Sequence, residues 1–127
     1  MAPARRLTLD PATLALCRLD PAAPPPAPPA SGIWALLRRG EELALVAAED
    51  SLPATAACIR GWRALVVEGP LDSSLVGVLA GILAPLAAAG VSVMTYATFD
   101  TDVILVRQVD LERAVAALRA AGYGIVE

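Results

Sequence analysis

The second half of this chain alternates strand-like and helix-like segments in an order that few folds accommodate. Trp62–Glu68 carries a continuous apolar run typical of a buried strand. Apolar residues then recur at helical spacing from 75 to 86. Val91–Thr98 and Val103–Gln108 predict two more strands, which are joined by the short polar connection 99–102.

Two further elements complete the series. A helix is expected to begin after a capping Asp110 and to end at Gly122, and Tyr123–Glu127 reads as a last short strand. The order β-α-β-β-α-β predicts an α+β, ferredoxin-like fold, a four-stranded antiparallel sheet with both helices on one face. The run Val103–Val106 is apolar on both sides, so its second face needs cover from another layer or a partner.

The first of these helices has sequence signals for its beginning and its end. The turn at 69–74 offers Asp72, Ser73 or Ser74 as an N-cap, with the helix starting at about Leu75. Gly90 is expected to stop it. One face carries the apolar residues, and another carries small residues that would let a neighbouring group approach closely. The small residues are Ser74, Gly77, Gly81 and Pro85.

The first half of the chain is less regular. Leu7 and Leu9 alternate with polar neighbours and predict a short strand, which Asp10-Pro11 is expected to end in a turn. Residues 21–29 hold six prolines, which forbids helix and central strand and predicts an exposed connector.

A hairpin is expected next. Gly32–Arg38 and Glu42–Ala47 are apolar runs on either side of Gly40. Ala54–Ile59 is expected to form one helical turn that Gly61 ends.

The residue inventory argues against catalysis. The chain has no His and no Lys, so it lacks an imidazole base, a Schiff-base amine and a phosphate-loop lysine. It has no glycine-rich nucleotide motif, and we expect no enzymatic activity, no cofactor and no bound metal. The widely separated Cys17 and Cys58 are expected to be reduced, buried thiols of a cytosolic protein.

Charge and hydropathy limit the kinds of partner that this chain can bind. The formal net charge is −3, and the ten basic residues, all Arg, are scattered, so nucleic-acid binding is not expected. The longest apolar stretch, Leu75–Val93, is broken by Gly, Pro and Ser, which disfavours a membrane span. Near the N-terminus, Asp10 and Pro11 interrupt any apolar leader after the arginine pair. We therefore expect a cytoplasmic protein.

A binding site is predicted where the first helix begins. Its N-terminal N–H groups and positive dipole end could hold a carboxylate beside Ser74 and Gly77. Asp102, at the start of a strand, could hold an ammonium group, so the pair suits a zwitterionic amino acid. The alternative from spacing alone is an ordinary capped helix and a polar turn. Asp100 and Asp102 together are a weak signal for a cation.

Three stretches resemble the ACT-domain family, namely Glu68–Gly90, Thr95–Val106 and Leu111–Ala114. The likeness is to small bacterial tandem-ACT proteins related to aspartokinase ACT domains, and to the arginine sensors of animal TOR signalling. It implies a degenerate first unit over 1–61, with the Pro-rich loop 21–29, and a second ACT unit over 62–127, packed side by side.

The same resemblance implies a non-catalytic regulatory protein with an amino-acid-sized site at an interface between units. Carried over by position, the ligand contacts would be Ser74, Val76, Gly77, Thr98, Phe99 and Asp102. Where the family commonly reads Phe-Ser-Leu-Thr-Gly, this chain has residues 73–77 as Ser-Ser-Leu-Val-Gly, and Val103 replaces a usual Tyr. An aromatic wall and hydroxyl groups are thus missing, and a pocket with fewer polar groups is less selective.

Two functions therefore compete. The first is a regulatory module that binds an amino acid, and the second is a ligand-free interaction module that dimerises through the ACT sheet. A homodimer is expected under both. An acylphosphatase-like enzyme on the same fold is disfavoured because 69–74 holds no Arg and the chain has no Asn.

Overall fold

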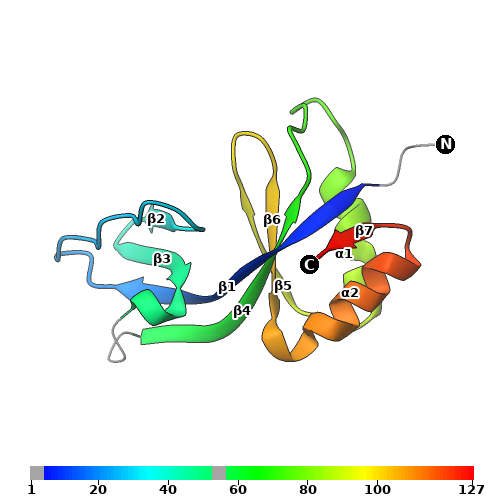
Figure 1. The fold of residues 1–127 in the computed structure, drawn as a ribbon. Coiled ribbons are helices and arrows are strands. Elements are labelled where there is room, and N and C mark those ends of the chain that lie inside the picture. The colour runs from blue at the N-terminus through cyan, green and yellow to red at the C-terminus, as the bar shows by residue number, and fades with distance from the viewer. Residues whose placement is uncertain (1–4, 53–56) are drawn as a thin grey trace. The chain divides into compact units, whose positions relative to one another are not determined.

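The computed structural model describes residues 5–52 and 57–127, which form two compact units (Figure 1). Unit 1 comprises Arg63–Glu127 with the described residues up to Pro11, and unit 2 comprises 12–62. The elements are β1 (Arg6–Leu19), β2 (Ala35–Arg39), β3 (Glu42–Ala48), η1 (Glu49–Ser51), β4 (Ala57–Val67), α1 (Val78–Ala88), β5 (Val93–Ala97), β6 (Asp102–Arg107), η2 (Gln108–Asp110), α2 (Leu111–Ala120) and β7 (Gly124–Val126).

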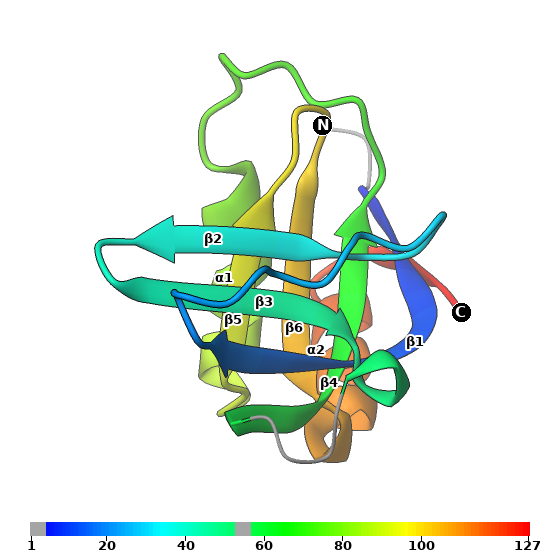
Figure 2. The same ribbon diagram turned by 90° about the vertical axis from the view of Figure 1, so that its left-hand side faces the viewer.

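Unit 1 has the predicted α+β, ferredoxin-like architecture. From β4 onward the order is β-α-β-β-α-β, and both helices lie on the same face of the strands of this unit (Figures 1 and 2). The strand order is β7–β1–β4–β6–β5. The first residues of β1 thus lie between β7 and β4, and Leu7 pairs in parallel with Ile125. The expected four-stranded antiparallel sheet was therefore wrong in two respects, because β1 adds a fifth strand and pairs in parallel with β7.

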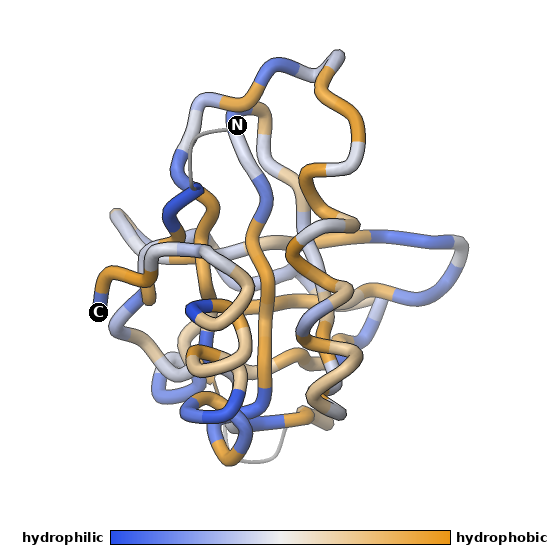
Figure 3. Tube along the Cα trace, turned by 90° about the vertical axis from the view of Figure 1, so that its right-hand side faces the viewer, coloured by the Kyte–Doolittle hydropathy of each residue, from blue (hydrophilic) through white to orange (hydrophobic). Residues whose placement is uncertain are grey.

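The core of unit 1 lies between the strands and the two helices. Ile82 and Leu86 of α1 and Leu118 of α2 are fully buried in one cluster with Ile104 and Val106 of β6. These helix residues repeat at the spacing that places apolar side chains on one face. The middle of β6 is hydrophobic and its two end residues are hydrophilic, and all four residues from 103 to 106 are buried (Figure 3).

Two glycines shape α1: one follows its C-terminal end, and the other allows a close contact with the residue before β7. The helix ends at Ala88, and Gly90 follows with a φ of 73°, the left-handed conformation that suits glycine after a helix. A Cβ built on Gly81 would lie 2.9 Å from Oη of Tyr123. The close approach expected at the small-residue face of this helix is therefore confirmed at Gly81.

The N-cap residue of α2 does not make the side-chain hydrogen bond that was expected of it. Asp110 occupies the N-cap position, but its side chain makes no capping hydrogen bond. Its carboxylate instead accepts a hydrogen bond from Nη2 of Arg113 at 2.8 Å. The prediction that the Asp110 side chain caps this helix was wrong, because a cation one turn away competes for the same oxygen.

Unit 2 is built from strands in the order β2–β3–β1–β4. The predicted hairpin is confirmed as β2 and β3, with Gly40 at the turn in a left-handed conformation, φ 59°. Residues 21–30 are exposed and belong to no helix or strand, as the proline content predicts. No helix in the described part of the chain is long and apolar enough to cross a membrane.

Two local predictions in this half were wrong. The chain does not turn at Asp10-Pro11, since β1 continues through both residues to Leu19. The φ of proline is compatible with extended backbone, and Nη2 of Arg63 donates to the Asp10 carbonyl at 3.1 Å.

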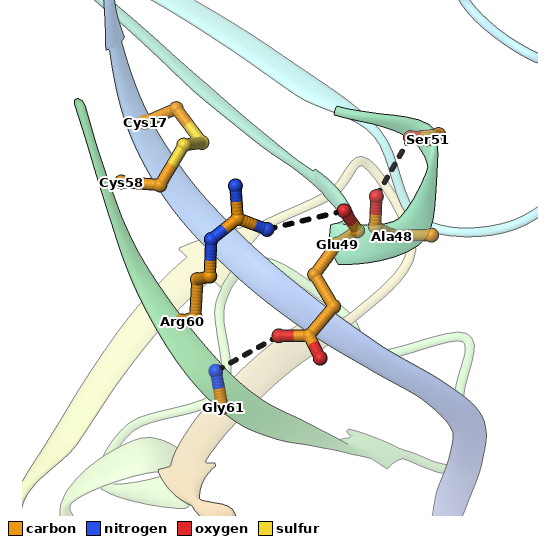
Figure 4. The surroundings of a disulfide bond; sticks show 7 residues. All are labelled: Cys17, Ala48, Glu49, Ser51, Cys58, Arg60 and Gly61. Atoms are coloured by element: carbon orange, nitrogen blue, oxygen red, sulfur yellow. Dashed lines mark hydrogen bonds between the residues drawn. A yellow bond between two sulfur atoms is a disulfide. The ribbon is translucent and has the colours of Figure 1, made fainter. Parts of the chain in front are cut away.

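The predicted helical turn at 54–59 begins outside the described residues, and Ala57–Ile59 belong to β4. Gly61 does not end a helix but lies inside β4 with a φ of 81°. Its N–H donates to Oε2 of Glu49 at 3.1 Å (Figure 4). A glycine in this conformation inside a strand is typical of a β-bulge.

The cysteines are joined, contrary to expectation. Cys17 of β1 and Cys58 of β4 form a disulfide across 41 positions of sequence, with their Cα atoms 4.0 Å apart (Figure 4). The prediction of two reduced thiols was wrong because it rested on sequence separation. The strand order brings β1 and β4 together as neighbours.

The core of unit 1 generates a stability prediction. Ile104→Ala empties a fully buried position and should lower the free energy of unfolding by about 3 kcal/mol. Val109→Ala is the control, because Val109 is 88% exposed and its truncation should cost under about 0.5 kcal/mol. Urea unfolding followed by circular dichroism measures both values. Equal effects of the two substitutions would contradict the proposed position of the core.

Candidate functional site

A hollow of about 350 Å³ opens in unit 1 beside the beginning of α1. One wall is the segment that leads into this helix together with its first turn, and the other is the connection between β5 and β6. The residues around it are Leu71, Asp72, Ser73, Leu75, Gly77, Val78, Leu79, Ala80, Thr98, Phe99, Asp100, Thr101 and Asp102.

The first wall is shaped by a turn that the sequence analysis assigned to helix capping. Asp72 Oδ1 accepts the Ser74 N–H at 2.8 Å and the Ser74 hydroxyl at 2.7 Å. This is the local bond pattern by which Asp stabilises a turn. The Asp72 carboxylate is therefore bonded to Ser74 outside the helix, since α1 begins at Val78 and not near Leu75. The prediction of an Asp or Ser cap was wrong.

Gly77 takes the N-cap position instead. Its φ is 81°, which is unfavourable for residues with a Cβ, and no side chain caps the helix. The first N–H groups of any α-helix lack acceptors within the helix, and the helix dipole is positive at this end. A Cβ added at Gly77 would meet nothing within 4 Å, so there is open space beside the helix terminus. The hollow thus has a side that favours an anion.

The second wall is a compact turn. Thr98 Oγ1 accepts the Thr101 N–H at 3.0 Å, and the Thr98 N–H donates to the Thr101 carbonyl at 2.8 Å. The turn holds Asp102 at the first position of β6, where its side chain lines the hollow and the residue is half-buried.

Direct contacts connect the two walls. The Leu71 N–H donates to the Asp100 carbonyl at 2.6 Å, and the Thr101 hydroxyl donates to the Val67 carbonyl. A Cβ on Gly69 would lie 2.9 Å from the Asp100 carbonyl oxygen, so only glycine permits this approach without a shift of the backbone. The width of the hollow is therefore set by backbone contacts.

Of the six residues predicted to contact a ligand, four line the hollow. Gly77 lies on the helix side, and Thr98, Phe99 and Asp102 lie on the opposite wall. Ser74 and Val76 are not among the lining residues, since Ser74 is engaged with Asp72 and Val76 is 95% exposed. Phe99 is fully exposed, at 101%.

Several residues of the hollow were not predicted as contacts. Leu71 and Asp72 belong to the first wall, and Asp100 and Thr101 to the second. The polar residues could have been predicted from the sequence, because a run of Asp and Thr between two strands places oxygen atoms at one edge of a sheet. The place of Leu71 in the hollow could not have been predicted, since it depends on the hydrogen bond to Asp100.

The charged side chains among the described residues of the hollow are all carboxylates. Asp72, Asp100 and Asp102 line it, and none of its described lining residues is basic. Hydrogen bonds from the Ser74 N–H and hydroxyl hold the pKa of Asp72 below its usual range. Among residues 5–52 and 57–127, no cluster of three or more Asp, Glu, Cys or His side chains has the arrangement of a metal site.

The lowered pKa generates a prediction at this wall. Ser74→Ala removes the hydroxyl donor but keeps the N–H donor, so the pKa of Asp72 should rise part of the way to its usual value. Because the folded-state pKa is depressed, the stabilising contribution of this carboxylate is present above its unfolded pKa and is lost as the pH falls through the folded pKa. Carboxyl-detected NMR titration measures the change. An unchanged Asp72 titration would show that the hydroxyl bond is absent in solution, and Ser92→Ala serves as the control.

Comparison with known proteins relates this architecture to others. A sequence model described as the ACT domain matches residues 57–120. An X-ray structure of a protein from Agrobacterium tumefaciens has a TM-score of 0.89 and 28% identity, covering 98% of this chain and 94% of that one. A search of curated protein sequences finds no match.

Two aspartate kinase structures share the fold at low identity. The ligand-free regulatory subunit of aspartate kinase from Thermus thermophilus has a TM-score of 0.61 at 14% identity, over 91% of this chain and 95% of that one. A structure of aspartokinase alpha and beta subunits has a TM-score of 0.64 at 16% identity, over 94% and 98%.

Proposed function

This chain belongs to the ACT domain family, and on that premise we propose that it is a non-catalytic regulatory protein that binds a small zwitterion, an amino acid, in the hollow of unit 1. The observation that carries the proposal is the meeting of an uncapped helix N-terminus and the carboxylate of Asp102 in one hollow. A zwitterion needs one group for each of its charges, and these two features supply them.

The proposed roles follow from position. The N–H groups at the start of α1 would bind the ligand carboxylate, and Gly77 would leave room for it. Asp102 would bind the ammonium group. Thr98 holds the turn that positions Asp102, through its bonds with Thr101. The volume of about 350 Å³ is in the range of small-molecule sites.

Ser74, Val76 and Phe99 need a second surface to act as ligand contacts. Val76 and Phe99 are almost wholly exposed, and neither is covered by the described part of the chain. We therefore propose that the complete site forms only when a second protein surface covers these residues. The division into a degenerate ACT-like unit over 1–61 and an ACT unit over 62–127 belongs to the same proposal.

The relatives and the residue inventory support a regulatory role. One solved relative is named as the regulatory subunit of aspartate kinase, and its shared fold is compatible with such a role here. The chain offers no His or Lys for acid–base or covalent chemistry. Binding and relay of a small-molecule signal require neither residue.

A thermal-shift screen against the twenty amino acids tests the proposal. A ligand at 100 times its Kd should stabilise the folded state by about 2.7 kcal/mol, which raises Tm by roughly 10 °C. Asp102→Asn should abolish that shift while the protein stays folded, because it removes the partner of the ammonium group. Asp20→Asn, which neutralises an exposed carboxylate in unit 2, should retain it. No shift with any amino acid would refute the proposal.

The exposed apolar side chains favour a second candidate, an interaction module that forms a homodimer without a ligand. Val76 and Phe99 are the most exposed of the large apolar residues, and Leu75 beside Val76 is 47% exposed. Leu75 and Phe99 line the same hollow, and exposed apolar side chains at one surface often mark a protein interface.

The second candidate has its own test. If these side chains form a dimer interface, Phe99→Ser should raise the dimer dissociation constant by at least tenfold in sedimentation equilibrium, since it replaces a large apolar contact with a polar one. Val109→Ser, also at an exposed apolar residue, should leave it unchanged. A monomer at all concentrations would exclude this candidate, and a dimer that is unaffected by Phe99→Ser would place the interface elsewhere.

A further inference from the structure

Unit 2 contains a cross-link that the proposed function does not use. We propose that the Cys17–Cys58 disulfide is a reducible switch that determines whether unit 2 is ordered, while the core of unit 1 stays folded in both redox states. The inference is independent of ligand binding, because both cysteines lie in 12–62 and all residues around the hollow of unit 1 lie in 71–102.

The disulfide encloses most of unit 2. The cysteines are separated by 41 in sequence, and the loop between them includes the Pro-rich segment, β2, β3 and η1. A cross-link stabilises a fold chiefly by restricting the unfolded chain, and the effect grows with the length of the enclosed loop. The opening of this bond therefore frees the whole loop.

Unit 2 has little else to compensate for that loss. The described part of this unit holds no α-helix, and its few buried side chains include two alanines. They are Leu14, Ala15, Cys17, Leu43, Leu45, Val46, Ala47 and Trp62. Units of about 50 residues bury a smaller fraction of their surface than larger domains, and many need cross-links to fold. Cys17, at 1% exposure, is itself part of this small core.

Cys58 is the more accessible of the two cysteines. Cys58 is half-buried and lines a hollow of about 470 Å³ whose other residues include Ala57 and Ile59, both exposed. A thiolate of a dithiol reductant would attack Sγ of Cys58 and form a mixed disulfide, and Cys17 would leave as a thiolate. The second thiol of the reductant then attacks the mixed disulfide and releases Cys58, so the protein gains two electrons and two protons while the reductant becomes a cyclic disulfide.

A guanidinium group lies on the same strand as Cys58. Arg60 lies two residues from Cys58 on β4, and alternate residues of a strand share one face (Figure 4). Its guanidinium donates to the Glu49 carbonyl at 3.3 Å, which holds the cation near this strand. A neighbouring positive charge stabilises thiolates, which are the species that form and leave during exchange.

Hydrogen exchange measured by mass spectrometry on the whole protein tests the switch. Peptides from β3 report on unit 2, and peptides from α2 report on unit 1. Addition of dithiothreitol should accelerate exchange in 43–48 at least tenfold and leave 111–120 within twofold, and reoxidation should restore the protection. The double variant Cys17→Ala/Cys58→Ala should match the reduced wild type and show no response to dithiothreitol.

Each other outcome would overturn the proposal. Two maleimide-reactive thiols in the air-oxidised protein would show that the bond does not form. Unchanged protection of 43–48 after reduction would show that unit 2 stays ordered without it. Equal loss of protection in 111–120, in the reduced protein or in the double variant, would show that the whole chain unfolds and that no local switch exists.

Discussion

Both units of this protein depend on the pairing of a single strand. In unit 1 the first residues of β1 lie between β7 and β4, where Leu7 pairs with Ile125. In unit 2 its later residues pair with β3, where Leu16 pairs with Val46. The register of a strand determines which side chains face the core, and a shift by one residue would reverse every one of them. One continuous strand therefore determines the register of two separate cores.

The candidate site is built mainly from backbone. Gly77 forms the N-cap in a conformation that other residues disfavour, and Gly69 lets the Asp100 carbonyl approach closely. The Leu71 N–H then joins the two walls at that carbonyl. Side-chain changes on the walls can therefore alter selectivity while the hollow keeps its form.

Periodicity was sufficient to predict the order of elements from β4 to β7, because each has an apolar pattern that local physics explains. It failed where tertiary contacts outweigh local signals. Asp10-Pro11 has turn chemistry but lies in a paired strand, and the Asp72 carboxylate stabilises a turn before the helix that it was expected to cap. Gly77 was predicted to be a ligand contact, and its N-cap role depends on a φ value that the local sequence does not encode. The Cys17–Cys58 pair depends on the neighbouring positions of β1 and β4, which no spacing rule supplies.

Val76 and Phe99 connect the two candidate functions. An apolar side chain that the chain itself leaves exposed is stabilised only by something outside it, whether a ligand or a second protein surface. The helix N-terminus at Gly77 follows Val76 directly, and Asp102 lies three residues after Phe99. A ligand bound by the charged groups would extend the surface available to a partner, and a partner seated on Phe99 would reduce the exposure of the ligand to water. Binding of either would then strengthen binding of the other, because reciprocal coupling of two equilibria follows from thermodynamic linkage.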